Sequence, residues 1–187
     1  MQEKPRLWEM RIAAIALDSE RSVPVVLLRD VDEQHQVPIW IGQVEAIAIA
    51  SELEGIRYAR PMTHDLLRST IERLHGDLLR VEINDLRDNT FYARLVIAHG
   101  GREVEVDSRP SDAIALAIRA GVGSYAHDHV VQAARIDPTP LTRGSEESSE
   151  AGDREGPIFQ APMPRSEEEW EALLAGLDPK AFGKYKH

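Results

Sequence analysis

The sequence contains no cysteine. This absence excludes disulfide bonds, thiol catalysis and metal sites with cysteine ligands, so any metal held by side chains needs His, Asp or Glu. No apolar run approaches the ~20 residues of a membrane-spanning helix, and the N-terminal MQEKPRLWEMR lacks the apolar segment of a signal peptide. We therefore expect a cytoplasmic protein without a membrane segment.

Several common active-site signatures are also absent. The chain has no Walker motif, no G-x-G-x-x-G, no G-x-S-x-G and no H-E-x-x-H, which removes the usual patterns of nucleotide-binding loops, serine hydrolases and zinc peptidases. A net charge of −10 argues against a protein that coats nucleic acid nonspecifically, although it does not exclude a nuclease. Lysine is scarce as well: up to residue 136 every basic residue except Lys4 is arginine, which favours bidentate contacts with phosphate or carboxylate.

The patterns that are present predict one α+β domain over residues 7–136, with a mixed β-sheet and packed helices. Proline, serine, glycine and glutamate then dominate residues 137–165, which predicts a flexible acidic linker. The S-x-x-E pattern at Ser166 predicts a short C-terminal helix within residues 166–187, which we expect to bind the domain or a protein partner. Within the domain we predict strands over 7–17, 23–29, 37–41, 78–86, 90–98, 103–106 and 122–126, and helices over 43–54, 65–75 and 113–120.

The stretch DSRPSD, residues 107–112, joins a predicted strand to an apolar helix that is closed by Gly121. Unpaired N–H groups at a helix start, together with Arg109, favour a bound phosphate, while Asp107 and Asp112 could hold a divalent metal. The structural alternative is that one of the two serines caps the helix, the proline occupies its first turn, and Arg109 pairs with a neighbouring aspartate.

A second junction, RPMTHDLL at residues 60–67, has a similar composition and also precedes an amphipathic helix. His64 could act as a general base or metal ligand, with Asp65 as a second ligand. Alternatively Thr63 caps the helix and Asp65 stabilises its first turn. Capping leaves His64 unexplained.

Four segments in this order and spacing, VPIWIGQVEAIAIASELEG, RPMTHDLL, NTFYARLVI and DSRPSDAIALAIRAG, resemble the bifunctional nuclease domain family of bacteria and plants. The resemblance covers about residues 10–135. It implies an α+β fold on a mixed sheet, a homodimer, and a nuclease that cleaves DNA and RNA with a divalent metal.

The roles of individual residues are our own hypothesis, and it requires the two junctions to meet at one edge of the sheet. Oxygen ligands would favour Mg²⁺ or Mn²⁺ over zinc. The hypothesis assigns catalysis to His64, Asp65, Asp107 and Asp112, phosphate binding to Arg60, Thr63, Arg109 and Ser111, and metal binding to Asp65, Asp107, Asp112, Glu45 and Glu54.

Two other functions remain open on the sequence. The chain could be a noncatalytic dimeric binding or regulatory module whose Arg/Asp junctions stabilise the fold, or a protein that binds a small phosphate ester or nucleotide. Burial separates the enzyme from the module: carboxylates that are paired with arginine and closed to solvent favour a structural role, whereas an open, concave cluster favours catalysis.

Overall fold

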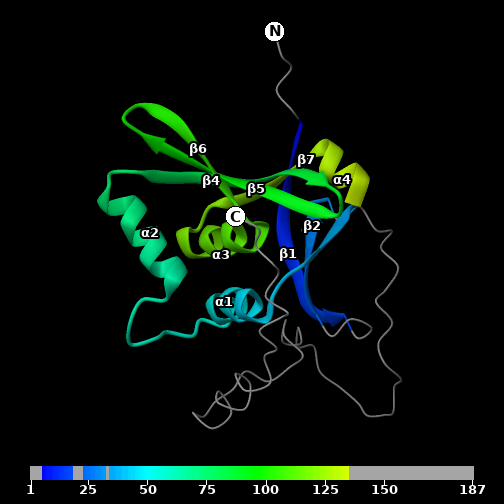
Figure 1. Cartoon of the computed structure of the whole chain (residues 1–187), viewed down its shortest axis with the longest axis horizontal. Helices are drawn as coiled ribbons and strands as arrows, with labels where there is room; N and C mark the ends of the chain where they lie inside the picture. Colours follow the sequence, from blue (N-terminus) through cyan, green and yellow to red (C-terminus); the bar gives the residue numbers. More distant parts are fainter. Residues whose placement is uncertain (1–5, 19–22, 33, 135–187) are drawn as a thin grey trace.

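The computed structural model describes residues 6–18, 23–32 and 34–134 of the 187 (Figure 1). The predicted linker over 137–165 and the predicted helix within 166–187 lie outside these residues. The described residues form seven strands and four helices, in the order β1 (Leu7–Asp18), β2 (Val23–Asp30), β3 (Gln36–Trp40), α1 (Gln43–Leu53), α2 (Thr63–Arg73), β4 (Asp77–Arg87), β5 (Thr90–His99), β6 (Arg102–Ser108), α3 (Pro110–Ala120), β7 (Gly123–His127) and α4 (Asp128–Ala134).

The seven strands make one mixed sheet in the order β3-β2-β1-β7-β4-β5-β6. The N-terminal meander of β1, β2 and β3 is antiparallel, as is the second meander of β4, β5 and β6. Strand β7 joins the two meanders, since it pairs antiparallel with β1 and parallel with β4. The predicted α+β fold with a mixed sheet is therefore confirmed.

Helices α2 and α3 pack against the β4–β5–β6 meander, and α1 packs against α3 and β2, so that these three helices form one layer (Figure 1). Helix α4 contacts β7 and β4 at the centre of the sheet, and also β3 and β1. Helix α3 is the centre of this layer because it packs against α1, α2, β4 and β5. Its residues 113–117 are all buried, in keeping with a helix that has neighbours on nearly all sides. This position brings the first turn of α3 close to the first turns of both other helices.

Local sequence explains where most elements end. Gly121 closes α3 in the left-handed conformation, as predicted, at φ 68°. Asp88 and Asn89 form the turn between β4 and β5 with φ 48° and 58°, a conformation that favours short polar residues. Among the described residues, no helix has the length and apolar character needed to cross a membrane.

Candidate active site

The two junctions predicted from the sequence do meet. Nε2 of His64, in the first turn of α2, lies 3.1 Å from Oδ1 of Asp112, in the first turn of α3. His64 is buried and Asp112 is half-buried, so this contact lies between the two helices and away from open solvent. The condition that both helix N-termini lie together is thus fulfilled.

Arg109 extends the pair to a third helix. Its Nε donates to Oδ2 of Asp112 at 2.6 Å and its Nη2 donates to Oδ1 at 3.0 Å, while Nη1 donates to Oε1 of Glu45 in α1 at 2.8 Å. Gly42 helps to place Glu45, because a Cβ at position 42 would collide with the second carboxylate oxygen of Glu45. We call His64, Asp112, Arg109 and Glu45 the three-helix cluster.

The charge state of Asp112 decides how His64 is held. Burial alone would raise the pKa of Asp112, but hydrogen bonds from His64 and Arg109 outweigh it and lower the pKa from 3.8 to about 2. An ionised carboxylate only accepts hydrogen bonds, so Nε2 of His64 must carry the hydrogen of this contact. In a neutral imidazole, Nδ1 is then the nitrogen that can accept a proton, and no described residue hydrogen-bonds to it.

Asp65 belongs to a different cluster. Its Oδ2 accepts from the backbone N–H of Met62, and its Oδ1 accepts from Nε of Arg119 at 2.9 Å. The Arg119 side chain is only 3% exposed and also donates to the backbone oxygens of Ala48 and Ala115, so it ties α1, α2 and α3 together. Sequence reasoning missed Arg119, although a single arginine in an otherwise apolar helix was a usable signal.

The remaining predicted site residues lie outside the three-helix cluster or at its border. Asp107 is exposed on β6, and Glu54 is exposed at the opposite end of α1 from Glu45. Arg60 and Thr63 are exposed before and at the start of α2, whereas Ser111 is buried beside Arg109. The structural alternative is wrong about the caps, because the N-caps are Met62 and Arg109 and neither Thr63 nor a serine. Its other parts are confirmed: the proline is in the first turn of α3, Arg109 pairs with Asp112, and Asp65 is in the first turn of α2.

The predicted set of five carboxylate ligands does not converge. Within residues 6–18, 23–32 and 34–134, no three His, Asp or Glu side chains are grouped so as to hold a metal ion. Glu45 and Asp112 do converge, but on the guanidinium of Arg109, which occupies the place between them. The described residues thus provide two carboxylates that bind one cation, and in this structure that cation is the guanidinium of Arg109.

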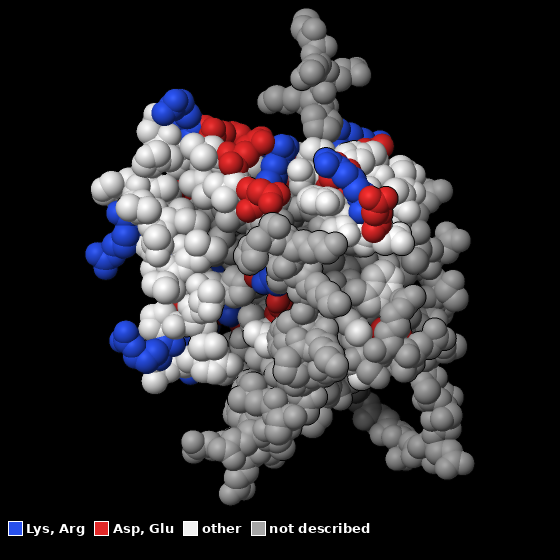
Figure 2. All heavy atoms as spheres, in the orientation of Figure 1, with Lys and Arg blue, Asp and Glu red and all other residues white. Residues whose placement is uncertain are grey.

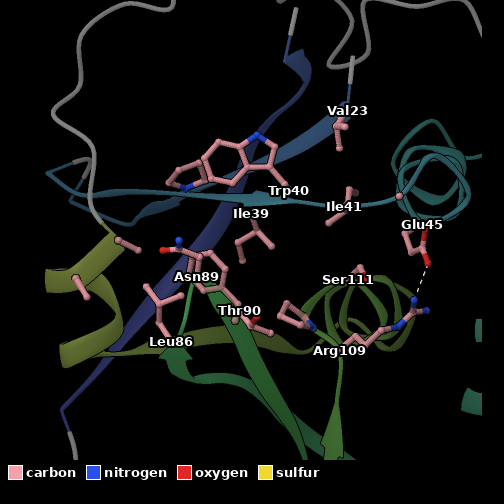
Figure 3. A pocket seen from close by; sticks show the side chains of 16 residues that line it. Val23, Ile39, Trp40, Ile41, Glu45, Leu86, Asn89, Thr90, Arg109 and Ser111 are labelled. Carbon is pink, nitrogen blue, oxygen red and sulfur yellow. Dashed lines mark hydrogen bonds and ion pairs between the residues drawn. The ribbon is translucent and has the colours of Figure 1, made fainter. Parts of the chain in front are cut away.

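A cavity of about 820 Å³ adjoins the three-helix cluster (Figure 3). Residues of β3 form one wall, the turn between β4 and β5 forms the facing wall, and α4 lies at one end. Glu45, Arg109 and Ser111 lie at the other end, where Figure 3 shows the ion pair between the first two. The cavity size is in the range of small-molecule and cofactor sites, and Arg109 links the cavity to the three-helix cluster.

A second charged cluster lies on β4, β5 and β7. Glu82 is 1% exposed, and it accepts from Arg80 at 2.7 Å, from Arg94 at 2.6 Å and from Nε2 of His127 at 3.0 Å. The same two arginines bind exposed glutamates of β6, so acidic and basic side chains alternate over this meander (Figure 2). No sequence pattern pointed to Glu82, because a charged residue in an alternating strand is normally assigned to the solvent face.

The family model of the bifunctional nuclease domain matches residues 26–139 of this chain. The chain belongs to the bifunctional nuclease domain family. The match covers α1, α2 and α3, and hence every residue of the three-helix cluster. The resemblance described from the sequence is therefore confirmed.

The chain matches several known proteins, and it covers a different share of the length of each. An uncharacterized protein of Mycobacterium tuberculosis is 42% identical over 130 residues, which is 70% of this chain and 77% of the relative. Bifunctional nuclease 1 of Oryza sativa subsp. indica is 29% identical over 125 residues, or 65% of this chain and 36% of the rice protein. Bifunctional nuclease 2 of Oryza sativa subsp. japonica is 26% identical over 108 residues, which is 56% of this chain and 33% of the rice protein. The match thus spans about a third of each rice protein.

Proposed function

We propose that this chain is a nuclease that hydrolyses phosphodiester bonds of DNA and RNA, and that the three-helix cluster is its catalytic site. The observation that carries the proposal is the contact between His64 and Asp112, extended by Arg109 to the mouth of a cavity. Membership of the bifunctional nuclease domain family and the names of the rice relatives support the same reaction class.

The cluster has the parts that phosphodiester hydrolysis requires. As water attacks phosphorus, His64 accepts its proton at Nδ1, and Asp112 holds the ring and stabilises the imidazolium that forms. The P–O bond to the leaving oxygen breaks, and this oxygen takes a proton from solvent water. Arg109 is half exposed, and its guanidinium is suited to bidentate binding of phosphate oxygens. When it binds a phosphate it exchanges part of its contact with Glu45 for the substrate, which keeps the number of charge-assisted hydrogen bonds nearly constant.

Dependence on Mg²⁺ or Mn²⁺ is part of this proposal. Mg²⁺ is often bound by one or two carboxylates and by the phosphates of the substrate, so Glu45 and Asp112 would hold it once Arg109 turns from the space between them toward the phosphate. Such an ion would neutralise charge on the phosphate and would lower the pKa of a water bound to it. We expect labelled single- and double-stranded DNA and RNA to be cleaved with Mg²⁺ or Mn²⁺ and left intact with EDTA. Cleavage that EDTA does not change would contradict the metal requirement.

The second candidate is a noncatalytic dimeric binding module. It is favoured by the observation that Arg109 and Arg119 both bind carboxylates of their own chain. The two arginines differ in exposure: the Arg119 side chain is enclosed, whereas half of the Arg109 side chain is exposed. A structural role therefore fits the Arg119 cluster better than the three-helix cluster. Purified protein that cleaves none of the four substrates under any metal condition would favour the module.

We further propose that the active unit is a homodimer joined through β6. Among the described strands this one is at the edge of the sheet, so one side of its backbone has no partner strand there. Val104 and Val106 are 40% and 42% exposed on it, and Leu66 and Leu74 are exposed on and just after α2. An edge strand can pair with its own copy across a two-fold axis. Its glutamates do not oppose this pairing, because Arg80 and Arg94 neutralise two of them.

Substituting both valines by glutamate is expected to convert the dimer to a monomer in sedimentation velocity. The matched control is Val31→Glu, which changes a valine that is 46% exposed just after β2 and should leave the dimer intact. A wild-type chain that sediments as a monomer at all concentrations, or a double variant that remains a dimer, would contradict this interface.

A further inference from the structure

We propose that Arg119 is a positioning residue of the candidate active site. Through Asp65 it fixes the first turn of α2, and this turn brings His64 to its contact with Asp112. The inference rests on the proposed nuclease function, in which His64 is the general base. Two separate observations carry it: the first turn of α2 has no apolar anchor, and the polar contacts that take the place of one involve Arg119.

Helix α2 is attached to the rest of the domain by few apolar side chains. His64 is the one buried residue among the 11 described residues of this helix. Ile71, two turns further on, is partly buried against the core, whereas Leu66 and Leu67 between them are exposed. A helix is normally held in place by packing of its apolar face, and in α2 only the second half has such an anchor. Polar contacts must therefore set the position of the first turn.

Two polar contacts join α2 to Arg119. Nε of the Arg119 side chain donates to Oδ1 of Asp65 at 2.9 Å, and Nη1 of Arg68 donates to the backbone oxygen of Arg119 at 2.8 Å. Oδ2 of Asp65 also accepts from the backbone N–H of Met62, so both oxygens of this carboxylate are held. Burial alone would raise the pKa of Asp65, but hydrogen bonds from Met62 and Arg119 outweigh it and lower the pKa. The carboxylate therefore stays ionised at neutral pH and keeps its ion pair.

The Arg119 side chain is itself held in one orientation. It is only 3% exposed, and its Nη1 and Nη2 donate to the backbone oxygens of Ala115 in α3 and Ala48 in α1. Helix α1 packs against α3 and has buried apolar residues of its own, so Ala48 is not free to move. A planar guanidinium with hydrogen bonds in three directions cannot turn without breaking one of them. Asp65 is therefore bound at a fixed place on α3.

The contact of Asp65 fixes its neighbour in sequence as well. His64 and Asp65 lie about 100° apart around the axis of α2, so a first turn that is fixed at Asp65 directs His64 toward α3. Without Arg119 this turn can move away from α3, while Ile71 still holds the second half of the helix. A shift of about 1 Å at a reacting group can lower a rate about 100-fold. Loss of Arg119 should thus disturb the hydrogen bond between His64 and Asp112.

The test is Arg119→Met in the full chain. This variant should fold, because the Asp65 side chain is 37% exposed and can be hydrated, and the oxygens of Ala48 and Ala115 keep the hydrogen bonds within their helices. The readout is NMR of the ring nitrogens of His64, at a pH where the ring is neutral. We expect the hydrogen at Nε2 in wild type and a mixture of both tautomers in Arg119→Met. An unchanged Nε2–H tautomer in the folded variant would overturn the proposal.

The matched control is Arg80→Met. Arg80 binds the buried carboxylate of Glu82 on the sheet, so its loss should lower stability and leave the tautomer of His64 unchanged. An equal change of tautomer in both variants would make the effect one of stability and exclude a positioning role. Arg119→Lys keeps a charged donor for Asp65 and should restore the Nε2–H tautomer. If Arg119→Met does not fold, Asp65→Asn breaks the same ion pair at a partly exposed position, and the same readout decides.

Steady-state cleavage assays separate this inference from the proposed function. Arg119→Met should lower kcat about 100-fold and leave KM nearly unchanged, since Arg109 keeps its contacts with Glu45 and Asp112. Cleavage at the wild-type rate by Arg119→Met, with an unchanged tautomer, would remove the positioning role and leave the nuclease standing. A wild-type chain that cleaves nothing would remove the nuclease, whereas a tautomer that changes in Arg119→Met and not in Arg80→Met would keep the role of Arg119 in holding His64.

Discussion

Replacing His64 with alanine is expected to reduce phosphodiester cleavage by about 100- to 10,000-fold, the usual contribution of a positioned general base. The loss should be in kcat, because Arg109, the residue proposed to bind the phosphate, is still held by Asp112 and Glu45 in this variant. Single-turnover cleavage of a labelled single strand measures the effect directly.

The control for this variant is a histidine outside the three-helix cluster. His129 in α4 has a side chain that is 58% exposed, so His129→Ala should cleave at the wild-type rate. Both variants must unfold at the wild-type urea concentration, because His64 is buried and also joins α2 to α3. Equal cleavage by folded His64→Ala and wild type would remove His64 from the mechanism and point to a contaminating nuclease.

Replacing Glu82 with glutamine is expected to lower the free energy of unfolding by about 3 kcal/mol at pH 7, because it leaves Arg80, Arg94 and His127 around a neutral group in a buried position. Urea unfolding provides the measurement. The matched control is Glu105→Gln, since Glu105 also binds Arg94 but has a side chain that is 55% exposed. An exposed pair of this kind contributes about 0.5 kcal/mol or less. An equal loss of unfolding free energy in the two variants would show that burial of Glu82 does not strengthen its ion pairs.

The loss of stability in Glu82→Gln is also expected to depend on pH. Burial would raise the pKa of Glu82, but hydrogen bonds from His127, Arg94 and Arg80 lower it from 4.5 to about 2. A group whose pKa is lower in the folded state stabilises the fold above its unfolded pKa and loses this effect as the pH falls. The difference between wild type and Glu82→Gln should therefore be full above pH 4.5 and shrink as the pH approaches 2. A difference that stays constant over this range would contradict the assignment.

Much of the fold could be predicted because the deciding signals are local. Apolar runs and alternating residues placed the strands to within one or two positions, and Gly121 marked the end of α3. The resemblance to the bifunctional nuclease domain family also followed from contiguous motifs. The meeting of His64 with Asp112 was stated as a condition that the sequence could not test, because the two residues are 48 positions apart.

The tertiary structure decided which charged residues act together. Spacing alone grouped Asp65 with His64 and Asp107 with Asp112, but helix geometry turns Asp65 toward Arg119, and Asp107 lies on an exposed strand. Neighbours in sequence point in different directions on a helix, so the next residue along the chain often belongs to another cluster.

The sequence by itself determined the strands and helices to within a few residues, and the family, because propensity, turn chemistry and periodicity depend on nearby residues. Only the tertiary structure decided the contact of Glu45 with Arg109, the burial of Glu82 and the cavity lined by Trp40. Each of these depends on how distant strands and helices pack, and burial fixes the energy of a charge far more than its residue type does.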